Sequence, residues 1–238
     1  MFAKTAAFYD RVYAALGKDY DREADVLAAL IRERAPRAAT LLDAGCGTGA
    51  HVARFERDGF ACRGFDLDPN MVKLARARCP EMEIEPGDVA TYASTERFDV
   101  VTCLFGAIAY VRTPERLAPA IANLAALLAP GGQLLVEAFL APADFVAGRP
   151  HAVFVDEPDL KLARMNVSKR LGAIAIIDFH YMLATGPGGV EREFERHEVG
   201  LFEVAQYRAA FEAAGLEWEA LAEPAFPRGL FRGCKPTP

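Results

Sequence analysis

The opening part of the chain carries apolar side chains three or four positions apart, the spacing that lines one face of an α-helix. The first such run consists of Phe8, Tyr9, Val12, Tyr13 and Leu16. The second consists of Val26, Leu27, Leu30 and Ile31. Because proline cannot continue a helix, the second run must end before Pro36. The pattern therefore predicts two amphipathic helices ahead of the first strand.

From Ala39 onward, short apolar runs alternate with amphipathic segments and with turns that contain Gly or Pro. The apolar runs predict strands at residues 40–42, 62–65, 82–84, 98–104 and 133–138. The amphipathic segments predict helices at residues 49–57, at 69–78, and from Pro114 to the turn at Pro130. Alternating strands and helices form a parallel sheet with helices on both faces, and ligands bind at the carboxyl ends of its strands. We therefore expect an α/β fold.

The pattern changes in residues 160–202, where two apolar runs flank a glycine-rich turn. The runs lie at 173–182 and 193–201, and the turn is Gly186-Pro187-Gly188-Gly189. This arrangement is typical of antiparallel strands joined by a hairpin. We therefore expect an antiparallel β insert, which can serve as the wall of a substrate pocket, as a dimer surface, or as both.

The charge balance bears on the class of partner. The chain has 27 Lys and Arg against 33 Asp and Glu, a formal net charge of -6. A nucleic-acid binder neutralises phosphates with a basic surface, so we expect no nucleic-acid partner. Arg228, Arg232 and Lys235 nevertheless gather near the end of the chain. Such a cluster can hold one anionic small molecule.

Cysteine usage and the opening residues bear on location. The five cysteines have no metal-ligand spacing, and we expect them to be reduced and mostly buried. They are Cys46, Cys62, Cys79, Cys103 and Cys234. Asp10 and Arg11 interrupt the opening apolar pattern, so neither a signal peptide nor a membrane span is expected. We therefore predict a cytoplasmic protein without a membrane partner and without a metal site.

The segment with the most specific chemistry is Leu41-Leu42-Asp43-Ala44-Gly45-Cys46-Gly47-Thr48-Gly49. Glycine carries no Cβ and accepts positive φ, so this turn can bring its backbone close to a ligand. Its glycines alternate, unlike the G-x-G-x-x-G spacing of dinucleotide-binding turns, and Asp43 precedes them. No pair of residues suited to hydride transfer is evident either. The motif therefore disfavours a nicotinamide dehydrogenase.

The motif resembles the cofactor loop of the class I S-adenosylmethionine-dependent methyltransferases. The resemblance implies a Rossmann-like sheet and S-adenosylmethionine as cofactor, with S-adenosylhomocysteine as product. Asp43 would attract the ammonium of the methionine part, Asp66 would bind the ribose hydroxyls, and Asp88 would meet the adenine amino group. The remaining cofactor contacts expected from this loop and the neighbouring strand ends are Gly45, Cys46, Gly47, Leu67, Val89 and Leu104.

Nearly the whole chain resembles the N-methyltransferases, including N,N-dimethyltransferases, of TDP-linked amino sugars. The matching segments are Tyr9-Asp10, Gly17-Lys18-Asp19-Tyr20, Arg22-Glu23, Val101-Thr102-Cys103-Leu104-Phe105, His180-Tyr181 and Arg228-Gly229-Leu230-Phe231. The resemblance implies that Tyr9, Lys18 and Tyr20 close over the methionine end of the cofactor. It also implies an acceptor pocket in which Arg228 meets the nucleotide diphosphate, a group that suits a planar guanidinium. The other residues assigned to this pocket are Glu23, Glu137 and His180.

Methyl transfer is an in-line displacement at a sulfonium, so the enzyme must chiefly align the nucleophile and exclude water. An amine with a pKa of about 8 is about one tenth neutral at pH 7, so mild proton acceptance suffices. Tyr110 follows the fourth strand, and we expect it to orient the amine and pass on its proton. His180 is the alternative for handling this proton.

We expect one methyltransferase domain over residues 1–238. It divides into an N-terminal helical lid at 1–35, a cofactor-binding core at 36–138, an antiparallel acceptor-side insert at 139–202, and a closing helix with strands at 203–238. Two other functions stay open on the sequence alone. One is O- or N-methylation of another small metabolite, and the other is cofactor binding without catalysis. The sugar, its nucleotide, the number of methyl groups and a homodimeric state are also open.

Overall fold

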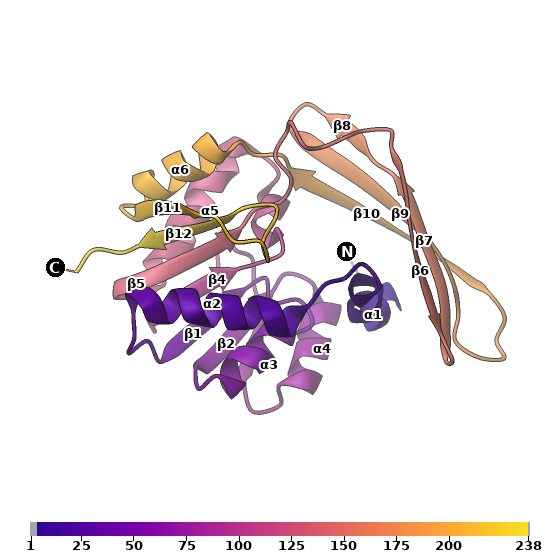
Figure 1. Ribbon diagram of the computed structural model, residues 1–238, viewed down its shortest axis with the longest axis horizontal. Helices are drawn as coiled ribbons and strands as arrows, with labels where there is room; N and C mark the ends of the chain where they lie inside the picture. Colours follow the sequence, from indigo (N-terminus) through magenta and orange to yellow (C-terminus); the bar gives the residue numbers. More distant parts are fainter. Residues whose placement is uncertain (1–3, 238) are drawn as a thin grey trace.

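The computed structural model describes residues 4–237 and contains two sheets, which are seen apart in Figure 1. The larger sheet has the strand order β11-β12-β5-β4-β1-β2-β3. Its parallel strands are β1 (Thr40–Ala44), β2 (Ala61–Asp66), β3 (Glu83–Pro86), β4 (Phe98–Cys103) and β5 (Leu128–Glu137). At one edge β12 (Leu230–Cys234) runs antiparallel to β5, and β11 (Glu217–Leu221) runs antiparallel to β12.

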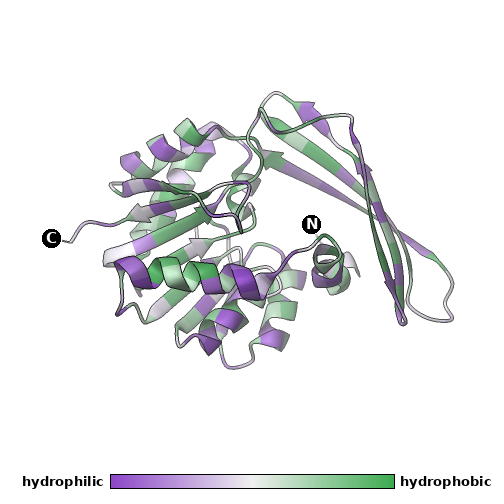
Figure 2. Ribbon diagram, in the orientation of Figure 1, coloured by the Kyte–Doolittle hydropathy of each residue, from purple (hydrophilic) through white to green (hydrophobic). Residues whose placement is uncertain are grey.

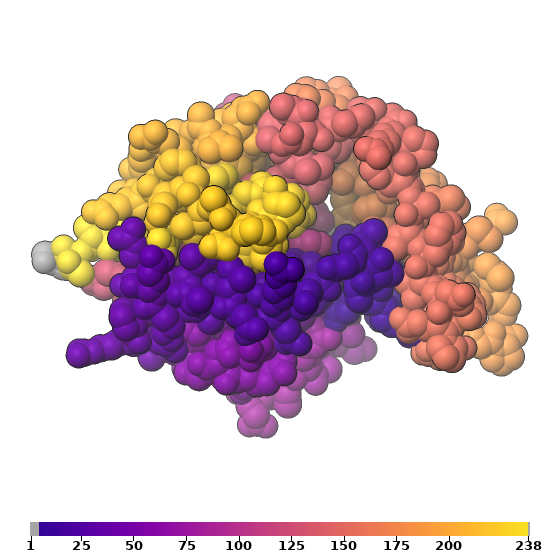
Figure 3. All heavy atoms as spheres, viewed as in Figure 1, coloured from indigo at the N-terminus to yellow at the C-terminus, as the bar shows by residue number. Residues whose placement is uncertain are grey.

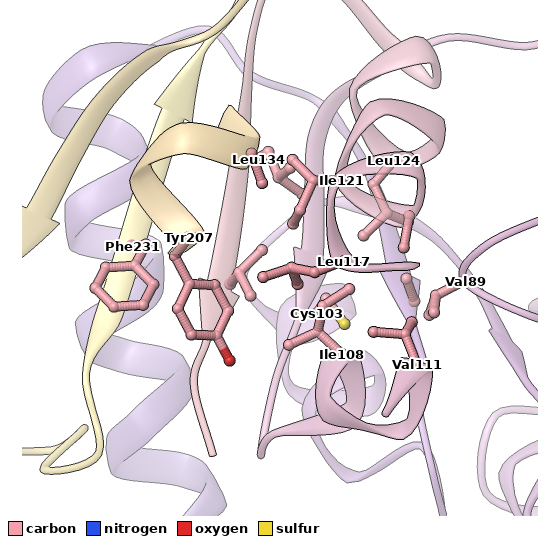
Figure 4. Close-up of a cluster of buried hydrophobic side chains, with 14 of the residues drawn as sticks. Val89, Cys103, Ile108, Val111, Leu117, Ile121, Leu124, Leu134, Tyr207 and Phe231 are labelled. Atoms are coloured by element: carbon pink, nitrogen blue, oxygen red, sulfur yellow. The ribbon is translucent and has the colours of Figure 1, made fainter. Parts of the chain in front are cut away.

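Helices cover both faces of this sheet. On one face lie α2 (Tyr20–Arg34), α3 (Ala50–Arg57) and α4 (Pro69–Arg78), and on the other lie α5 (Pro114–Ala126), α6 (Val204–Ala213) and the short 3-10 helix η2 (Ala107–Val111). Leu27 and Ile31 of α2 pack with Leu41 of β1 in one buried cluster. Figure 4 shows the opposite face, where side chains of α5 and α6 meet those of the strands. The expected Rossmann-like α/β class is confirmed.

The smaller sheet is antiparallel, with the strand order β10-β9-β7-β6 and with β8 paired to β9. Its strands are β6 (Pro150–Glu157), β7 (Leu160–Val167), β8 (Lys169–Leu171), β9 (Ile174–Ala184) and β10 (Glu191–Gly200). The expected hairpin of β9 and β10 is present, and β7 joins it. The sequence pattern did not reveal β6, because its apolar residues fall on both faces. Val153 and Val155 are buried, whereas Phe154 between them is 65% exposed.

The first helical segment lies between the two sheets. It comprises the 3-10 helix η1 (Lys4–Phe8) and α1 (Tyr9–Ala14), so the expected single helix is shorter and irregular at its start. Val12 is buried against the inner face of the smaller sheet. Asp10 accepts hydrogen bonds from the Thr48 hydroxyl (2.7 Å) and from Arg78, which belong to the larger sheet's side of the molecule. In Figures 1 and 3 this indigo segment bridges the core and the strands of the smaller sheet.

The smaller sheet has two different faces, and the mixed colouring of its strands in Figure 2 reflects their alternation. Residues on its outer face include several large exposed apolar side chains. These are Phe154, Met165, Met182 and Phe194. The register aligns Met165 of β7 and Phe194 of β10 on either side of His180 in β9. His180 therefore belongs to the outer face.

The basic cluster near the end of the chain does not form as a unit. Arg232 is 1% exposed and bonds Glu219 (Nε to carboxylate, 3.0 Å) and the Leu30 carbonyl (3.2 Å). Lys235 donates to the Ala125 carbonyl at the end of α5 and to the Leu128 carbonyl at the start of β5. Both residues therefore fasten β12 to its neighbours, and the expectation that they help to hold an anionic ligand is wrong.

Within residues 4–237, no helix combines the length and the apolar character that crossing a bilayer requires.

Phe211 of α6 is fully buried, and its ring fills the space left by the absent side chain of Gly233. We expect Phe211→Ala to lower the free energy of unfolding by about 3–5 kcal/mol, since it removes a ring from a packed core. Urea unfolding followed by circular dichroism measures this change. The control is Val204→Ala on the same helix, where the side chain is exposed. Equal midpoints for the two variants would show that α6 is not part of the cooperative core.

Candidate active site

The glycine-rich turn between β1 and α3 is held by the next strand. Gly45 and Gly47 adopt positive φ values of 74° and 56°. The Gly45 and Cys46 N–H groups donate to the Phe65 carbonyl (2.8 and 3.0 Å), and the Gly47 N–H donates to the Asp66 carboxylate (2.8 Å). A Cβ at Gly45 would lie 2.7 Å from that of Ala107, so only glycine fits there. These contacts fix the conformation of the turn, and Gly45 and Gly47 line a cavity.

Two adjoining cavities meet at this turn. The main cavity lies at the carboxyl ends of the parallel strands, and a smaller one lies beside it next to Thr48 and His51. Residues shared by their walls are Tyr9, Gly45, Gly47, Leu104 and Phe105. Expected cofactor residues that line only the main cavity are Asp66, Leu67, Asp88 and Val89, and those that line only the smaller one are Tyr20, Asp43 and Cys46.

The three acids of the strand ends are in different environments. Burial raises the pKa of Asp43, whose carboxylate accepts a hydrogen bond from the Thr102 hydroxyl (2.7 Å). Burial also raises the pKa of Asp66 to about 6, although Gly47 and Asp68 N–H groups bond its ionised form. Asp88 accepts a bond from the Ala90 N–H (2.9 Å). Asp66 and Asp88 therefore make local turn contacts and also face the cavity.

The smaller cavity contains groups that suit the methionine part of the expected cofactor. The Tyr20 hydroxyl is buried there and, among the described residues, has no hydrogen-bond partner. Asp43 brings a buried carboxylate to the same cavity, which a cationic ammonium would compensate. A phenol donor and an acid are the partners that an amino-acid carboxylate and ammonium need. The residues present thus fit S-adenosylmethionine.

Lys18 and Glu23 support this corner without lining either cavity. The Lys18 ammonium lies 3.8 Å from the centre of the Phe105 ring and 2.5 Å from the Glu23 carboxylate. Glu23 also bonds the His51 Nε2 (2.9 Å) and is buried. Glu23 lines neither cavity, and one of its partners, His51, lines the smaller one, so its expected role in the acceptor pocket stays a prediction.

Arg228 lines the main cavity, and Glu137 fixes it there. Glu137 is buried at the end of β5, where its carboxylate accepts bonds from Arg228 Nε (3.1 Å) and Nη2 and from the Phe105 N–H (2.6 Å). The Arg228 guanidinium lies 4.4 Å from the centre of the Phe105 ring. Glu137 does not line the cavity, contrary to its expected contact with the acceptor. It positions Arg228 instead.

Tyr110 of η2 lines the main cavity, as expected for a residue beside the acceptor. Its hydroxyl lies 2.8 Å from Nδ1 of His197, a buried residue of β10 that lines the same cavity. Burial raises the pKa of the Tyr110 hydroxyl well above its ordinary value. Tyr110 therefore stays a neutral phenol.

The histidine at this cavity is His197 and not His180. His180 is exposed and packs against Phe194, with ring centres 5.1 Å apart, outside the cavity. Side chains alternate along a strand, and Phe179 and Tyr181 on either side of His180 occupy the inner face. The sequence could not reveal which face His197 takes, because its neighbours along β10 are polar on both sides of the strand.

A further cavity adjoins the main one on the side of the smaller sheet. The two share Phe139, Ile177 and Phe179 in their walls. Arg149 and Arg164 bring two positive charges to the further cavity, and Asp144 brings one negative charge. Neither arginine lies in a motif that marks it in the sequence. Together the two cavities provide room for an elongated ligand with an anionic portion.

Comparison with known proteins identifies the family of this chain. Residues 41–132 match the family model described as a methyltransferase domain. A dTDP-3-amino-3,6-dideoxy-alpha-D-glucopyranose N,N-dimethyltransferase of Streptomyces fradiae is 36% identical over 228 residues, which cover 96% of this chain and 89% of the relative. A dTDP-4-amino-2,3,4,6-tetradeoxy-D-glucose N,N-dimethyltransferase of Saccharopolyspora spinosa is 36% identical over 231 residues, covering 97% and 92%.

Solved structures show the same relationship over the full chain. DesVI of Streptomyces venezuelae matches with a TM-score of 0.92 at 36% identity and covers 100% of both chains. CalS10 of Micromonospora echinaspora, an amino pentose methyltransferase solved with S-adenosylmethionine, matches with a TM-score of 0.87 at 33% identity and covers 99% of this chain and 98% of its own. The chain is therefore an S-adenosylmethionine-dependent methyltransferase and belongs to the same family as the N,N-dimethyltransferases of dTDP-linked amino sugars.

Proposed function

We propose that this enzyme transfers methyl groups from S-adenosylmethionine to the amine of a TDP-linked amino sugar and adds two of them. The observation that carries this proposal is the identity of 36% over 96% of the chain to an enzyme named for that reaction. The cavity supports it, since cofactor-loop residues, Tyr110 and Arg228 line one continuous space.

The cofactor would lie along the ends of β1 to β3. Asp43 and Tyr20 would bind its methionine ammonium and carboxylate, Asp66 its ribose hydroxyls, and Asp88 its adenine amino group. Tyr9 belongs to the lid and lines both cavities, so it would close over the methionine end. Lys18 would not contact the cofactor; its ammonium would hold the Phe105 ring, which lines both cavities, in place. When bound, the cofactor supplies the methyl group of its sulfonium.

The protein's contribution to the reaction is alignment and removal of water. The α1 segment and the smaller sheet close the main cavity from two sides, which excludes water and strengthens polar contacts inside it. Tyr110 would accept a hydrogen bond from the acceptor amine and so direct its lone pair toward the methyl group. A raised pKa suits this role, because a neutral phenol keeps both its donor and its acceptor.

The acceptor would extend from Tyr110 toward charged groups. Arg228 stands in the main cavity and would meet one phosphate of the nucleotide, because a planar guanidinium binds phosphate with two parallel hydrogen bonds. Arg149 and Arg164 of the adjoining cavity would meet the anionic remainder of a nucleotide. This path requires the acceptor to pass Phe139 and Phe179, which line both cavities.

The enzyme would act in the cytoplasm as a homodimer. Free cysteines, which include all five of the chain, are typical of a reducing compartment. A contiguous apolar surface on a folded protein marks an interaction site, and Phe154, Met165, Met182 and Phe194 share the outer face of the smaller sheet. A second copy would cover this face.

The affinity for S-adenosylmethionine should depend on pH through Asp66. Its pKa of about 6 means that the carboxyl gains a proton as the pH falls below that value, and a protonated acid binds ribose hydroxyls less well. We expect affinity to fall about tenfold per pH unit below about 6, since the cofactor's own amino and carboxyl groups do not titrate there. Titration calorimetry at pH 5 and 7.5 measures this. Asp66→Asn should bind weakly at both pH values; a persisting pH dependence would show that Asp66 is not its source.

The proposed reaction is tested directly with S-adenosylmethionine and a TDP-linked amino sugar. We expect mass spectrometry to show two added methyl groups. Arg228→Lys keeps the charge beside Glu137 but loses the planar fork, so it should raise KM for the sugar about tenfold, the cost of one charge-assisted hydrogen bond. The matched control is Arg196→Lys on the outer face, bonded to Asp178. Methylation of other amines with no turnover of any nucleotide sugar would refute the proposed acceptor.

The dimer is tested by light scattering after size-exclusion chromatography. We expect the native chain to be dimeric and Phe154→Glu to be monomeric, because the charge would be buried against the second copy. Val204→Glu changes an exposed apolar residue on α6 and should leave the dimer intact. A monomeric native chain would contradict the proposal.

A further inference from the structure

A chain of polar side chains leads away from Tyr110 into the smaller sheet. The Tyr110 hydroxyl lies 2.8 Å from His197 Nδ1, and His197 Nε2 lies 3.5 Å from the Glu195 carboxylate. Glu195 in turn accepts a hydrogen bond from the Tyr181 hydroxyl (3.1 Å), which Arg164 also contacts. This series of polar side chains therefore connects the main cavity to the buried Glu195 carboxylate and ends at the buried Arg164.

Strand geometry places these groups on one face. Glu195 and His197 are two positions apart on β10, and both are 3% exposed. Burying an acid and an imidazole away from water costs free energy unless they are paired. Leucine or valine would fill the same positions of the sheet more cheaply. A purely structural role accounts poorly for polar groups whose first member, Tyr110, faces the cavity.

We propose that His197 is the proton acceptor of this enzyme, acting through the Tyr110 hydroxyl, and that Glu195 stabilises the imidazolium that forms. This inference rests on the proposed N-methylation. The histidine tautomer with hydrogen on Nε2 leaves the Nδ1 lone pair to accept a hydrogen bond from Tyr110. Nε2 lies 3.5 Å from the Glu195 carboxylate, near enough for the negative charge to stabilise an imidazolium. His197 is then a base whose imidazole is oriented by a neighbouring carboxylate, as in other enzymes that use a base and an acid together.

The proton transfer balances within these groups. After methyl transfer the acceptor nitrogen is an ammonium. One N–H bond breaks with its electron pair staying on nitrogen, while the proton forms an O–H bond at Tyr110. The original Tyr110 O–H bond breaks at the same time, and its proton forms an N–H bond at His197 Nδ1. Tyr110 ends neutral, and the positive charge rests on His197 beside Glu195 until water removes the proton.

The need for proton transfer through Tyr110 to His197 differs between the two methyl transfers. A free amine with a pKa of about 8 supplies about one tenth of its molecules in the neutral form at pH 7, so the first transfer can draw on amine that is already neutral in solution. The monomethylated product forms as an ammonium inside a closed cavity. S-adenosylhomocysteine must be replaced by a second S-adenosylmethionine, and the bound ammonium must lose a proton, before the same sugar can be methylated again without dissociating. His197 is therefore required chiefly for the second transfer.

The test compares products of single binding events in the native enzyme and in variants. His197→Asn can still hydrogen-bond Tyr110 from the Nδ1 position but cannot take up a proton. We expect it to release mainly monomethylated sugar, with kcat for the second methyl lowered about 100-fold or more, at the lower end of the effect of a general base, and with KM little changed. Glu195→Gln should give a weaker version of this product pattern. Tyr110→Phe should also favour monomethylated sugar, but it should slow the first transfer as well, because it removes the hydroxyl that orients the amine. Glu212→Gln, at an exposed position of α6 away from the cavities and from the outer face, is the control.

The outcomes separate this inference from the proposed function. A native enzyme that does not methylate the sugar refutes the proposed function itself. A native enzyme that adds two methyl groups, together with a folded His197→Asn that also adds two at the native rate, overturns the inference alone. If His197→Asn does not fold, Glu195→Gln decides by the same product ratio. A rise in KM with no change in product ratio would show that His197 only shapes the pocket.

Discussion

Parallel pairing of β1 with β2 on one side and β4 on the other is the constraint on which the site depends. It brings the ends of these strands to one edge, where Asp43, Asp66 and the start of η2 come together although they are far apart in the chain. The glycine turn can then be bonded by Phe65 and Asp66 of the neighbouring strand. Removing this pairing would disperse the cofactor residues and the acceptor residues together.

The smaller sheet adds what the larger sheet lacks. The carboxyl ends of the strands in a parallel sheet lie open to solvent. Methyl transfer needs a cavity there that excludes water. The inner face of the smaller sheet packs on α1 through Val12 and on the core through Val199, so the lid and the insert support each other. The bond from Thr48 to Asp10 ties the lid to the cofactor loop itself.

Local sequence patterns were sufficient for the order of the elements and for several residues that line the main cavity. The α/β order, the helix at Pro69–Arg78 and the cavity positions of Asp66, Asp88 and Tyr110 follow from runs of neighbouring residues, which the chain itself displays. Errors arose where a long-range partner decides the outcome. Glu219, on the neighbouring strand, draws Arg232 into the interior.

Strand register explains the remaining difference. The side-chain period of a strand is two, so a choice of face places His180 outside and the next strand's His197 inside. Nothing in the residues around His180 reveals that choice, because its apolar neighbours suit either face. Once the face is known, the two faces of the β9–β10 hairpin can be distinguished. The outer face presents an apolar surface, and the inner face presents polar groups next to Tyr110. The register of β10 therefore cannot shift by one residue. Such a shift would bury Phe194 in place of Glu195 and remove His197 from the cavity.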